Sequence, residues 1–256
     1  MILAIDIGNS NIVLGCIEDG RPLFVERLST DRNKTELEYA LQLRSILQLN
    51  GISPQEISGG ILSSVVPPLS QVVRGCVERI LGRRILTVGP GLKTGLNIKI
   101  DNPGTLGSDQ VVDAVAAIAE YPTPLIVIDM GTATTMSCID ASGTYLGGAI
   151  IPGLRVAVDS LTTQTSQLPR ISFEAPEHVI GKNTIDCMKS GAIMGNAALL
   201  DGMIDRMTDE LGSVPTVVAT GGLVPCVVPH CRHQIIMDDN LLLKGLWILY
   251  AKNTKR

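Results

Sequence analysis

A strand-turn-strand pattern occurs twice in the chain, and this repeat limits the possible folds more than any other feature. The first copy reads ILAIDIGNSNIVLGCIEDG near the start, and the second reads LIVIDMGTATTMSCIDASG near the middle. Their alignment places Asp129 over Asp6 and Gly131 over Gly8. Each copy has an apolar strand, a small polar turn, a second apolar strand and a closing turn, as in a β-hairpin.

A second similarity follows each hairpin in the same order. The segment GGILSSVVP ends at Pro67, and VVATGGLVP ends at Pro225. Chance similarity is one explanation, because strands and turns are simple patterns. Because both repeated segments occur in the same order, we favour instead a chain made of two related halves. The two prolines of EYPTP, at 120–124, interrupt the pattern and predict domains at 1–122 and 123–256.

Helical patterns fill the space between these strand-rich segments. Residues 35–49 begin with a threonine cap and acidic residues, continue with leucines at helical spacing, and are followed by a glycine. Residues 110–120 and 190–211 also fit amphipathic or buried helices. Strands mixed with helices in each half predict an α/β fold with a mixed sheet and flanking helices in each domain.

The composition limits the classes of function. Hydrophobic residues make up 45% and charged residues 18% of the 256 residues, which is typical of a globular protein with a substantial core. The net charge is -4 and no basic run occurs, so we expect no nucleic-acid partner. No apolar run reaches membrane-spanning length and no signal-peptide pattern begins the chain, so we expect a cytoplasmic protein without a membrane partner.

The six cysteines are scattered, which favours free thiols. The closest pair is Cys226 and Cys231, with His230 and His233 nearby. No spacing among them matches a zinc knuckle, so a zinc site there is the minor alternative.

The repeated turn has chemistry that suits a phosphate ligand. In two facing copies, Asp6 and Asp129 would lie on either side of a cleft between the domains. Glycines let the backbone approach a ligand closely, and successive amides can bind phosphate oxygens. A carboxylate needs a cation between itself and a phosphate, and magnesium fits because it binds carboxylates together with phosphates and waters. An ordinary hairpin turn is the alternative, but it explains Gly8 without explaining its companion Gly131.

These turns resemble the two phosphate motifs of the actin, sugar kinase and heat-shock chaperone superfamily, and ATGG resembles its adenosine motif. Within that superfamily the chain most resembles the type III pantothenate kinases. The resemblance covers nearly the whole chain through TGLNIKIDNP, GSD, GGAIIPG, TGG and DDNLLLKGLWILYAKN, in that order. It implies two actin-like, ribonuclease H-like domains around an ATP cleft, with the first phosphate loop in one domain and the second loop and adenosine motif in the other.

The resemblance also implies an activity and a set of site residues. The activity is the ATP-dependent phosphorylation of pantothenate, the first step of coenzyme A synthesis, in a homodimer. Asp109 would be the catalytic base, Asp6 would place magnesium, and Asp129 would bind a monovalent cation, usually potassium. The residues implied to bind ATP are Asp6, Ile7, Gly8, Asn9, Ser10, Asn11, Ile12, Val13 and Thr132, and those implied to bind the substrate are Gly107, Ser108, Asp109, Gln110 and Thr184.

Several of these residues have a structural alternative. From spacing alone Asp109 is favoured as the amino-terminal cap of the following helix, and only the resemblance reverses that preference. Thr184 is about equally suited to capping a helix or to completing the pantothenate site, often across a dimer interface in the family. Asp129 could cap a turn. Gly221 and Gly222 could leave room for adenine and ribose or simply turn a strand into a helix.

Two positions depart from the family pattern. Gln110 stands where the family usually has arginine, and Ile100 stands where a tyrosine is common. Arginine would pair with the pantothenate carboxylate through a charged fork, whereas glutamine offers only neutral hydrogen bonds. These departures leave two alternatives to the pantothenate kinase, namely a nucleotide-binding regulatory homologue with weak or no kinase activity and a kinase for another small hydroxy acid.

Overall fold

The structure is a computed structural model that describes residues 1–254. The described residues form two compact units, and each unit is made of segments that are separate in the sequence. Unit 1 contains Met1–Leu96, Asn102–Ala119 and the described residues from Asn240 onward, and unit 2 contains Asn97–Asp101 and Glu120–Asp239. The domain ranges 1–122 and 123–256 stay a prediction, to which the structure adds that the residues from Asn240 group with unit 1.

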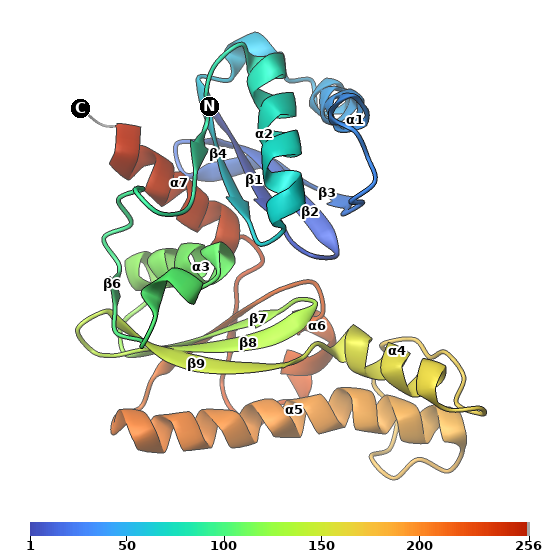
Figure 1. Ribbon diagram of the computed structural model, residues 1–256. Coiled ribbons are helices and arrows are strands. Elements are labelled where there is room, and N and C mark those ends of the chain that lie inside the picture. The colour runs from blue at the N-terminus through green and yellow to red at the C-terminus, as the bar shows by residue number, and fades with distance from the viewer. Residues whose placement is uncertain (255–256) are drawn as a thin grey trace. The chain divides into compact units, whose positions relative to one another are not determined.

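Unit 1 is built around a five-stranded mixed sheet with the order β3-β2-β1-β4-β5 (Figure 1). Strand β1 pairs antiparallel with β2 and parallel with β4. The strands are β1 (Ile2–Ile7), β2 (Asn11–Glu18), β3 (Arg21–Ser29), β4 (Gly59–Ser64) and β5 (Leu86–Thr87). The helices are α1 (Glu36–Leu49), α2 (Pro67–Leu81), α3 (Ser108–Glu120) and α7 (Leu241–Thr254), and η1 (Pro54–Glu56) and η2 (Pro103–Thr105) are single 3-10 turns.

Strand β1 is buried on both faces, and its alternating side chains pack into two separate cores. Leu3, Ile5 and Ile7 belong to the core that includes residues of α1 and α2. Ile2 and Ala4 belong to the core that includes residues of α3 and α7. Asp6 follows in the same alternation, so this carboxylate lies at the end of the face that α3 and α7 cover.

Unit 2 repeats this arrangement. Its sheet has the order β11-β10-β7-β8-β9-β6, in which β7 pairs antiparallel with β8 and parallel with β10. Strands β7, β8, β9, β10 and β11 take the places that β1, β2, β3, β4 and β5 have in the unit 1 sheet. Strand β6 is added at the edge, beside β9. The elements are β6 (Asn97–Ile98), β7 (Leu125–Met130), β8 (Ala133–Ile139), β9 (Thr144–Pro152), β10 (Thr216–Thr220), β11 (Ile236–Met237), α4 (Leu154–Gln164), α5 (Thr184–Leu211), α6 (Val224–Val227) and η3 (Val228–His230). The predicted fold class, α/β with a mixed sheet and flanking helices in each half, is confirmed.

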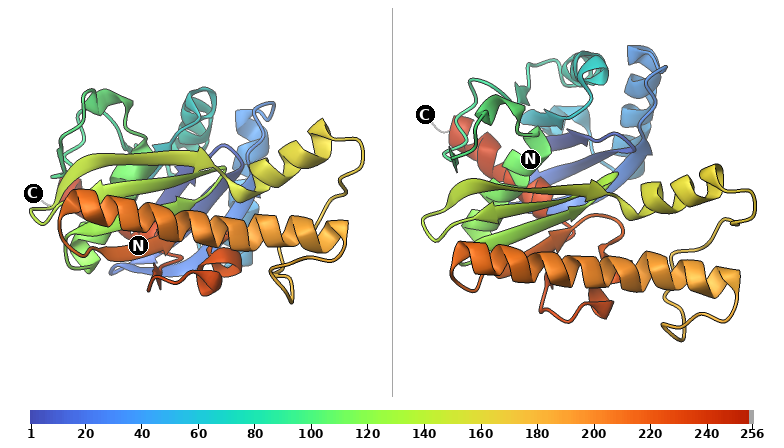
Figure 2. Two further views of the ribbon diagram at one scale, coloured as in Figure 1. Left: turned by 90° about the horizontal axis from the view of Figure 1, so that it is seen from below. Right: turned by 60° about the horizontal axis from the view of Figure 1, so that its bottom comes forward.

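The predicted helices form, with shifted starts. Helix α1 begins after Thr35, whose side chain and that of Glu38 make a capping box. Helix α5 runs for 28 residues and begins before the predicted 190–211. Figure 2 shows α5 along one face of the unit 2 sheet, with α4 beside its first part and both continuing past the ends of the strands.

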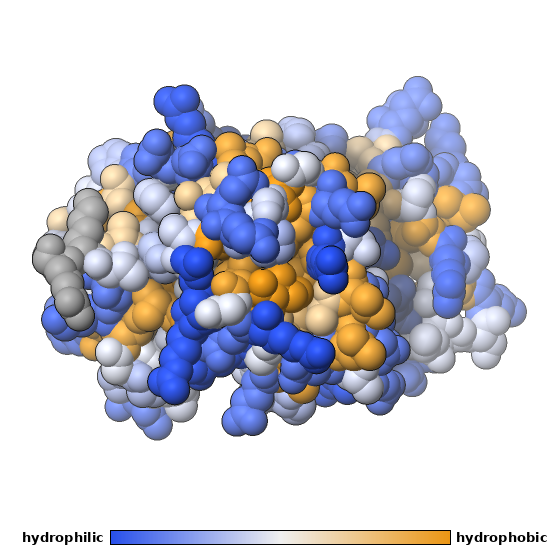
Figure 3. Space-filling model, turned by 90° about the horizontal axis from the view of Figure 1, so that it is seen from above, coloured by the Kyte–Doolittle hydropathy of each residue, from blue (hydrophilic) through white to orange (hydrophobic). Residues whose placement is uncertain are grey.

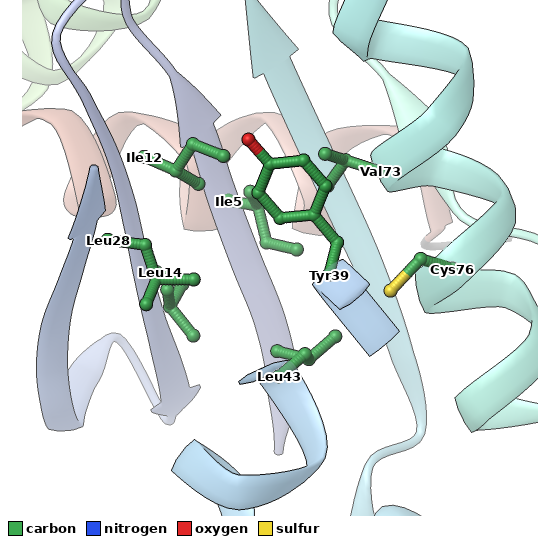
Figure 4. Close-up of a pocket in the computed structure, with 8 residues that line it drawn as sticks. All are labelled: Ile5, Ile12, Leu14, Leu28, Tyr39, Leu43, Val73 and Cys76. Carbon is green, nitrogen blue, oxygen red and sulfur yellow. The ribbon is translucent and has the colours of Figure 1, made fainter. Parts of the chain in front are cut away.

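The core of unit 1 contains a small apolar cavity next to Tyr39 (Figure 4). Its volume is about 20 Å³, enough for roughly one water molecule, but the apolar lining offers that water few partners. The Tyr39 hydroxyl instead donates to the backbone oxygen of Asp31 at 2.8 Å. The lining residues are Ile5, Ile12, Leu14, Leu28, Tyr39, Leu43, Val73 and Cys76. The cavity is therefore a packing defect and too small for a substrate.

The six cysteines are free, as predicted. Burial raises the pKa of the Cys16 and Cys76 thiols to about 12, so both stay protonated at neutral pH. Within residues 1–254 no group of three or more His, Cys, Asp or Glu side chains is arranged to hold a metal ion. The zinc alternative is wrong, because Cys231 packs against the unit 2 core and His233 pairs with Asp205 at 2.8 Å.

No helix in the described part of the chain has the length and apolar character needed to cross a membrane.

Candidate functional site

The first repeated turn, at 8–10, connects β1 to β2 and is held by backbone bonds. The amide of Gly8 donates to the oxygen of Asn11 at 3.0 Å. Thr30, just after β3, braces the turn from the side, since its amide donates to the oxygen of Ser10 at 3.0 Å and its hydroxyl to the oxygen of Gly8 at 2.7 Å. The side chains of Asn9, Ser10 and Asn11 are left exposed to a ligand.

Arg32 is a cation at this turn that the sequence analysis missed. Its guanidinium donates to the side-chain oxygen of Asn9 at 3.2 Å, and it is exposed. A positive charge beside exposed amides suits a phosphate ligand. The polar run TDRNKT, which follows β3, is a signal that could have found it.

Asp6 is the next-to-last residue of β1, and only Ile7 separates it from this turn. It is 6% exposed, and its register partners are Ser63 on the parallel strand β4 and Val13 on the antiparallel strand β2. Register partners on adjacent strands point to the same face of a sheet. The side chains of Asp6 and Ser63 therefore share the face covered by α3 and α7.

Asp109 lies in the first turn of α3, on unit 1 as well. It is the second residue of the helix and not the residue before it, so it is not the helix cap that spacing alone favours. One carboxylate oxygen accepts a bond from the amide of Gln110 at 2.7 Å. Burial raises the pKa of Asp109 and outweighs the lowering by the Gln110 amide. A carboxyl group with a raised pKa is a better proton acceptor when it is ionised.

Gly107 lies close to this carboxylate. A Cβ atom at Gly107 would be 2.4 Å from an Asp109 carboxylate oxygen. The carboxylate would therefore have to move if any other residue stood at 107. This close approach, and not a positive φ, is the physical reason for glycine here.

The second repeated turn, at 131–132, connects β7 to β8 and is one residue shorter than the first. The amide of Gly131 donates to the oxygen of Ala133 at 3.0 Å, as Gly8 does to Asn11. The structural match is therefore Ala133 with Asn11, one residue away from the sequence alignment. Gly153, in GGAIIPG, packs on this turn, since its amide donates to the oxygen of Thr132 at 3.2 Å and a Cβ atom there would be 2.3 Å from that oxygen.

Asp129 is the next-to-last residue of β7, as Asp6 is of β1. Its register partners are Thr135 on β8 and Thr220 on β10, so one carboxylate and two hydroxyl groups share a face of the sheet. Gly221 follows with a φ of 111°, and a Cβ atom there would be 2.7 Å from the backbone of Met130. Both the conformation and the close approach require glycine at 221.

Thr184 is exposed and is the first residue of α5. The cap of α5 is Asn183, whose side-chain oxygen accepts from the amide of Asp186 at 2.9 Å. The alternative that Thr184 caps the helix is wrong, because the residue before it does so. The Thr184 hydroxyl is thus not needed for capping.

Comparisons with known proteins agree with this geometry. Residues 2–206 match the family of type III pantothenate kinases. The type III pantothenate kinase of Brevibacillus brevis is 45% identical over 253 residues, which are 99% of each chain. That of Bacillus cytotoxicus is 42% identical over 253 residues, which are 99% of this chain and 97% of the relative.

Solved structures at lower identity give the fold. A Sinorhizobium meliloti protein described as a candidate 2-dehydro-3-deoxygalactonokinase has a TM-score of 0.61 at 11% identity, over 100% of this chain and 98% of its own. The two matched sheets and turns define a protein of the actin-like ATPase fold that sugar kinases share. Within that class, the chain belongs to the type III pantothenate kinase family.

Proposed function

We propose that the chain transfers the terminal phosphate of ATP to pantothenate, giving 4'-phosphopantothenate in the first step of coenzyme A biosynthesis. The observation that carries the proposal is 45% identity over 99% of the chain to a type III pantothenate kinase. The alternative of a regulatory homologue with weak or no kinase activity is not favoured by relatives of this identity and coverage.

In this proposal Asp109 is the catalytic base. It accepts the proton of the pantothenate hydroxyl as that oxygen attacks the terminal phosphate of ATP. Its burial and raised pKa support the role. Asp6 lies on the same unit and on the sheet face that α3 covers, which supports a donor and an acceptor site built on one framework.

ATP binds at the first turn, through the residues 6–13, with Thr132 as a further contact. The exposed residues at 9–11 and the nearby Arg32 support phosphate binding. Magnesium is held by Asp6 together with ATP phosphates and waters. A single carboxylate fits magnesium, because magnesium usually takes only one or two carboxylates together with substrate phosphates and waters.

Asp129 binds a monovalent cation, which we propose to be potassium. The oxygens of Asp129, Thr135 and Thr220 lie on one face of the sheet, and hard cations prefer oxygen ligands of this kind. The cation supplies positive charge beside the second turn, where Thr132 contacts ATP.

Pantothenate binds through Gly107, Ser108, Asp109 and Gln110, with Thr184 completing the site. Gln110 supplies a neutral amide in place of the family arginine. Loss of a charge-assisted contact of this kind weakens binding by about 1.5–3 kcal/mol, or roughly ten- to a hundredfold. We therefore expect a higher KM for pantothenate than an arginine at 110 would give.

We also propose a homodimer. Exposed apolar side chains gather on α4, the segment before α5, and the start of α5, where these elements extend past the sheet of unit 2 (Figure 2). They are Val156, Leu161, Val179, Ile180 and Ile185, with exposures of 44–83%. Apolar surface of this kind marks an interface. On the face seen in Figure 3, hydrophilic side chains break up the apolar patches. A cytoplasmic location completes the proposal, since ATP is the phosphate donor.

An assay of ADP release tests the activity. Purified protein is incubated with pantothenate, ATP and magnesium, with and without potassium. We expect turnover that needs pantothenate and is stimulated by potassium, and a kcat lower by about 10²-fold or more in Asp109→Asn. Folded protein without turnover at millimolar pantothenate would refute the proposal, and a substrate screen that finds a better acceptor would replace pantothenate by that hydroxy acid.

A further inference from the structure

A network of serine hydroxyls joins the start of α3 to the end of β4. The Ser108 hydroxyl donates to the backbone oxygen of Ser64 at 3.0 Å and accepts from the Ser64 amide at 3.1 Å. The Ser63 hydroxyl donates to the Ser108 oxygen at 2.9 Å. Ser108 thus makes three hydrogen bonds to two adjacent residues of a strand that is 44 and 45 positions away in sequence.

These bonds connect the two acids of the candidate site. Ser63 is the register partner of Asp6, and Ser108 is the residue before Asp109. Neighbouring strands lie about 4.8 Å apart. Asp6 is thus one strand spacing from Ser63, and Ser63 is hydrogen-bonded to Ser108, the residue before Asp109. This short path fixes the position of Asp109 relative to Asp6.

The environment of the network makes it stiff. Ser63 is fully buried, and Ser108 is half-buried. A buried hydroxyl that loses its partner costs about 1–3 kcal/mol, so the bonds resist opening. The hydroxyl of Ser108 already has its one proton committed to Ser64 and its oxygen occupied by two donors, which leaves little capacity for a substrate.

We propose that Ser108 and Ser63 are positioning residues, which hold Asp109 at a fixed place beside Asp6 without touching pantothenate. This inference rests on the proposed function and changes one part of it, the role of Ser108 as a substrate contact. The positioning matters for rate because a displacement of a catalytic group by about 1 Å can lower the rate by roughly a hundredfold.

The main test uses Ser108→Ala with Ser108→Thr and Ser70→Ala as matched variants. Thr keeps the hydroxyl. Ser70 lies 2.7 Å from the Ser64 hydroxyl, in the same network but without a bond to α3. We expect Ser108→Ala to lower kcat about tenfold or more with less than twofold change in either KM, Ser108→Thr to restore most of kcat, and Ser70→Ala to leave both constants unchanged. Ser63→Ala should have a smaller effect, because Ser108 keeps its bonds to Ser64.

A double-mutant cycle separates positioning from a general loss of structure. In an Asp109→Asn background, the Ser108→Ala change should not lower the residual kcat further, because no base is left to position. A raised KM for pantothenate at unchanged kcat would overturn the proposal in favour of a substrate contact. Equal effects of Ser108→Ala with and without Asp109 would also overturn it.

Failure of the proposed function is recognised separately, by wild-type protein that has no turnover with pantothenate. In that case amide exchange decides the inference. The Val111 amide, which bonds to the oxygen of Gly107 at 3.1 Å, reports the first turn of α3. We expect its exchange to be at least tenfold faster in Ser108→Ala and unchanged in Ser70→Ala, and equal exchange in all three proteins would overturn the proposal.

Discussion

Asp109 is a partly buried carboxyl group in the first turn of a helix. Burial raises its pKa, and the Gln110 amide binds only one of its two oxygens. The group is thus less stable as a carboxylate than an exposed aspartate and more ready to take up a proton. In a site of this kind, the buried carboxylate lowers the folding stability and increases the reactivity.

Replacing this carboxylate should therefore separate activity from stability. Asp109→Asn should lower kcat by about 10²- to 10⁴-fold, the usual contribution of a general base. The folded-state pKa of Asp109 is raised, so its contribution to stability is fully present below the ordinary aspartate pKa, falls as the pH rises to the raised value, and stays constant above that value. Asn does not ionise, so the variant should not show this fall.

Urea unfolding of both proteins between pH 4 and 8, together with kcat at each pH, checks this prediction. Wild-type kcat should fall below the raised pKa as the base is protonated. A variant that is equally active, or that loses stability with rising pH as the wild type does, would contradict it.

Substitutions of Gln110 test whether this single residue binds the carboxylate of pantothenate. Gln110→Arg should lower the KM for pantothenate by roughly ten- to a hundredfold, because a guanidinium forms charge-assisted bonds to the carboxylate. The KM for ATP should not change. Gln110→Met, which removes the amide at similar volume, is the matched control and should raise the KM for pantothenate. Equal values in all three proteins would place the pantothenate carboxylate elsewhere.

Residue patterns predicted the turns and their acids but not their neighbours. Asp6 and Gly8 are local features of a strand followed by a turn, and a repeat made them recognisable. Arg32 and Ser63 reach the site only because β3 folds beside β2 and β4 folds beside β1. Such contacts depend on register between segments far apart in sequence, which no local pattern contains.

At the scale of elements, the start of α5 offers a paired test. Asn183→Ala should lower the free energy of unfolding by about 1 kcal/mol, because the Asp186 amide loses its acceptor. Thr184→Ala should leave stability unchanged and raise the KM for pantothenate. Urea unfolding and steady-state kinetics of both variants measure the two effects. A stability loss in Thr184→Ala equal to that in Asn183→Ala would contradict this division of roles.

The order of the elements was predictable from the repeat. The first residue of some helices and the membership of α7 in unit 1 were not. The two hairpins and the strands that follow them fold into sheets of the same order, as two related halves require. Helix α5 begins at Thr184 and not at the predicted 190, because its first turns depend on the Asn183 cap. The place of α7 in unit 1 is decided by long-range packing, and its apolar sequence fits either unit.

For the whole molecule, the proposed dimer predicts a mass of about twice the 27.2 kDa of the chain in light scattering. Ile180→Asp should reduce it to the monomer mass, because a carboxylate would be buried in an apolar interface. Leu49→Asp is the matched control, since Leu49 at 85% and Ile180 at 83% are about equally exposed and Leu49 lies on α1 of unit 1. A monomeric wild type, or equal masses for both variants, would contradict the proposed interface.

The packing of α7 has a consequence for synthesis on the ribosome. Leu243, Leu246 and Leu249 complete the core that begins with Ile2 and Ala4. Every residue of unit 2 is translated before α7, so unit 2 can finish folding while one face of the unit 1 sheet still lacks a covering helix. The nascent chain therefore carries the part of that apolar face that α7 covers exposed until the segment 241–254 has left the exit tunnel, and this is the stage at which a chaperone would protect it.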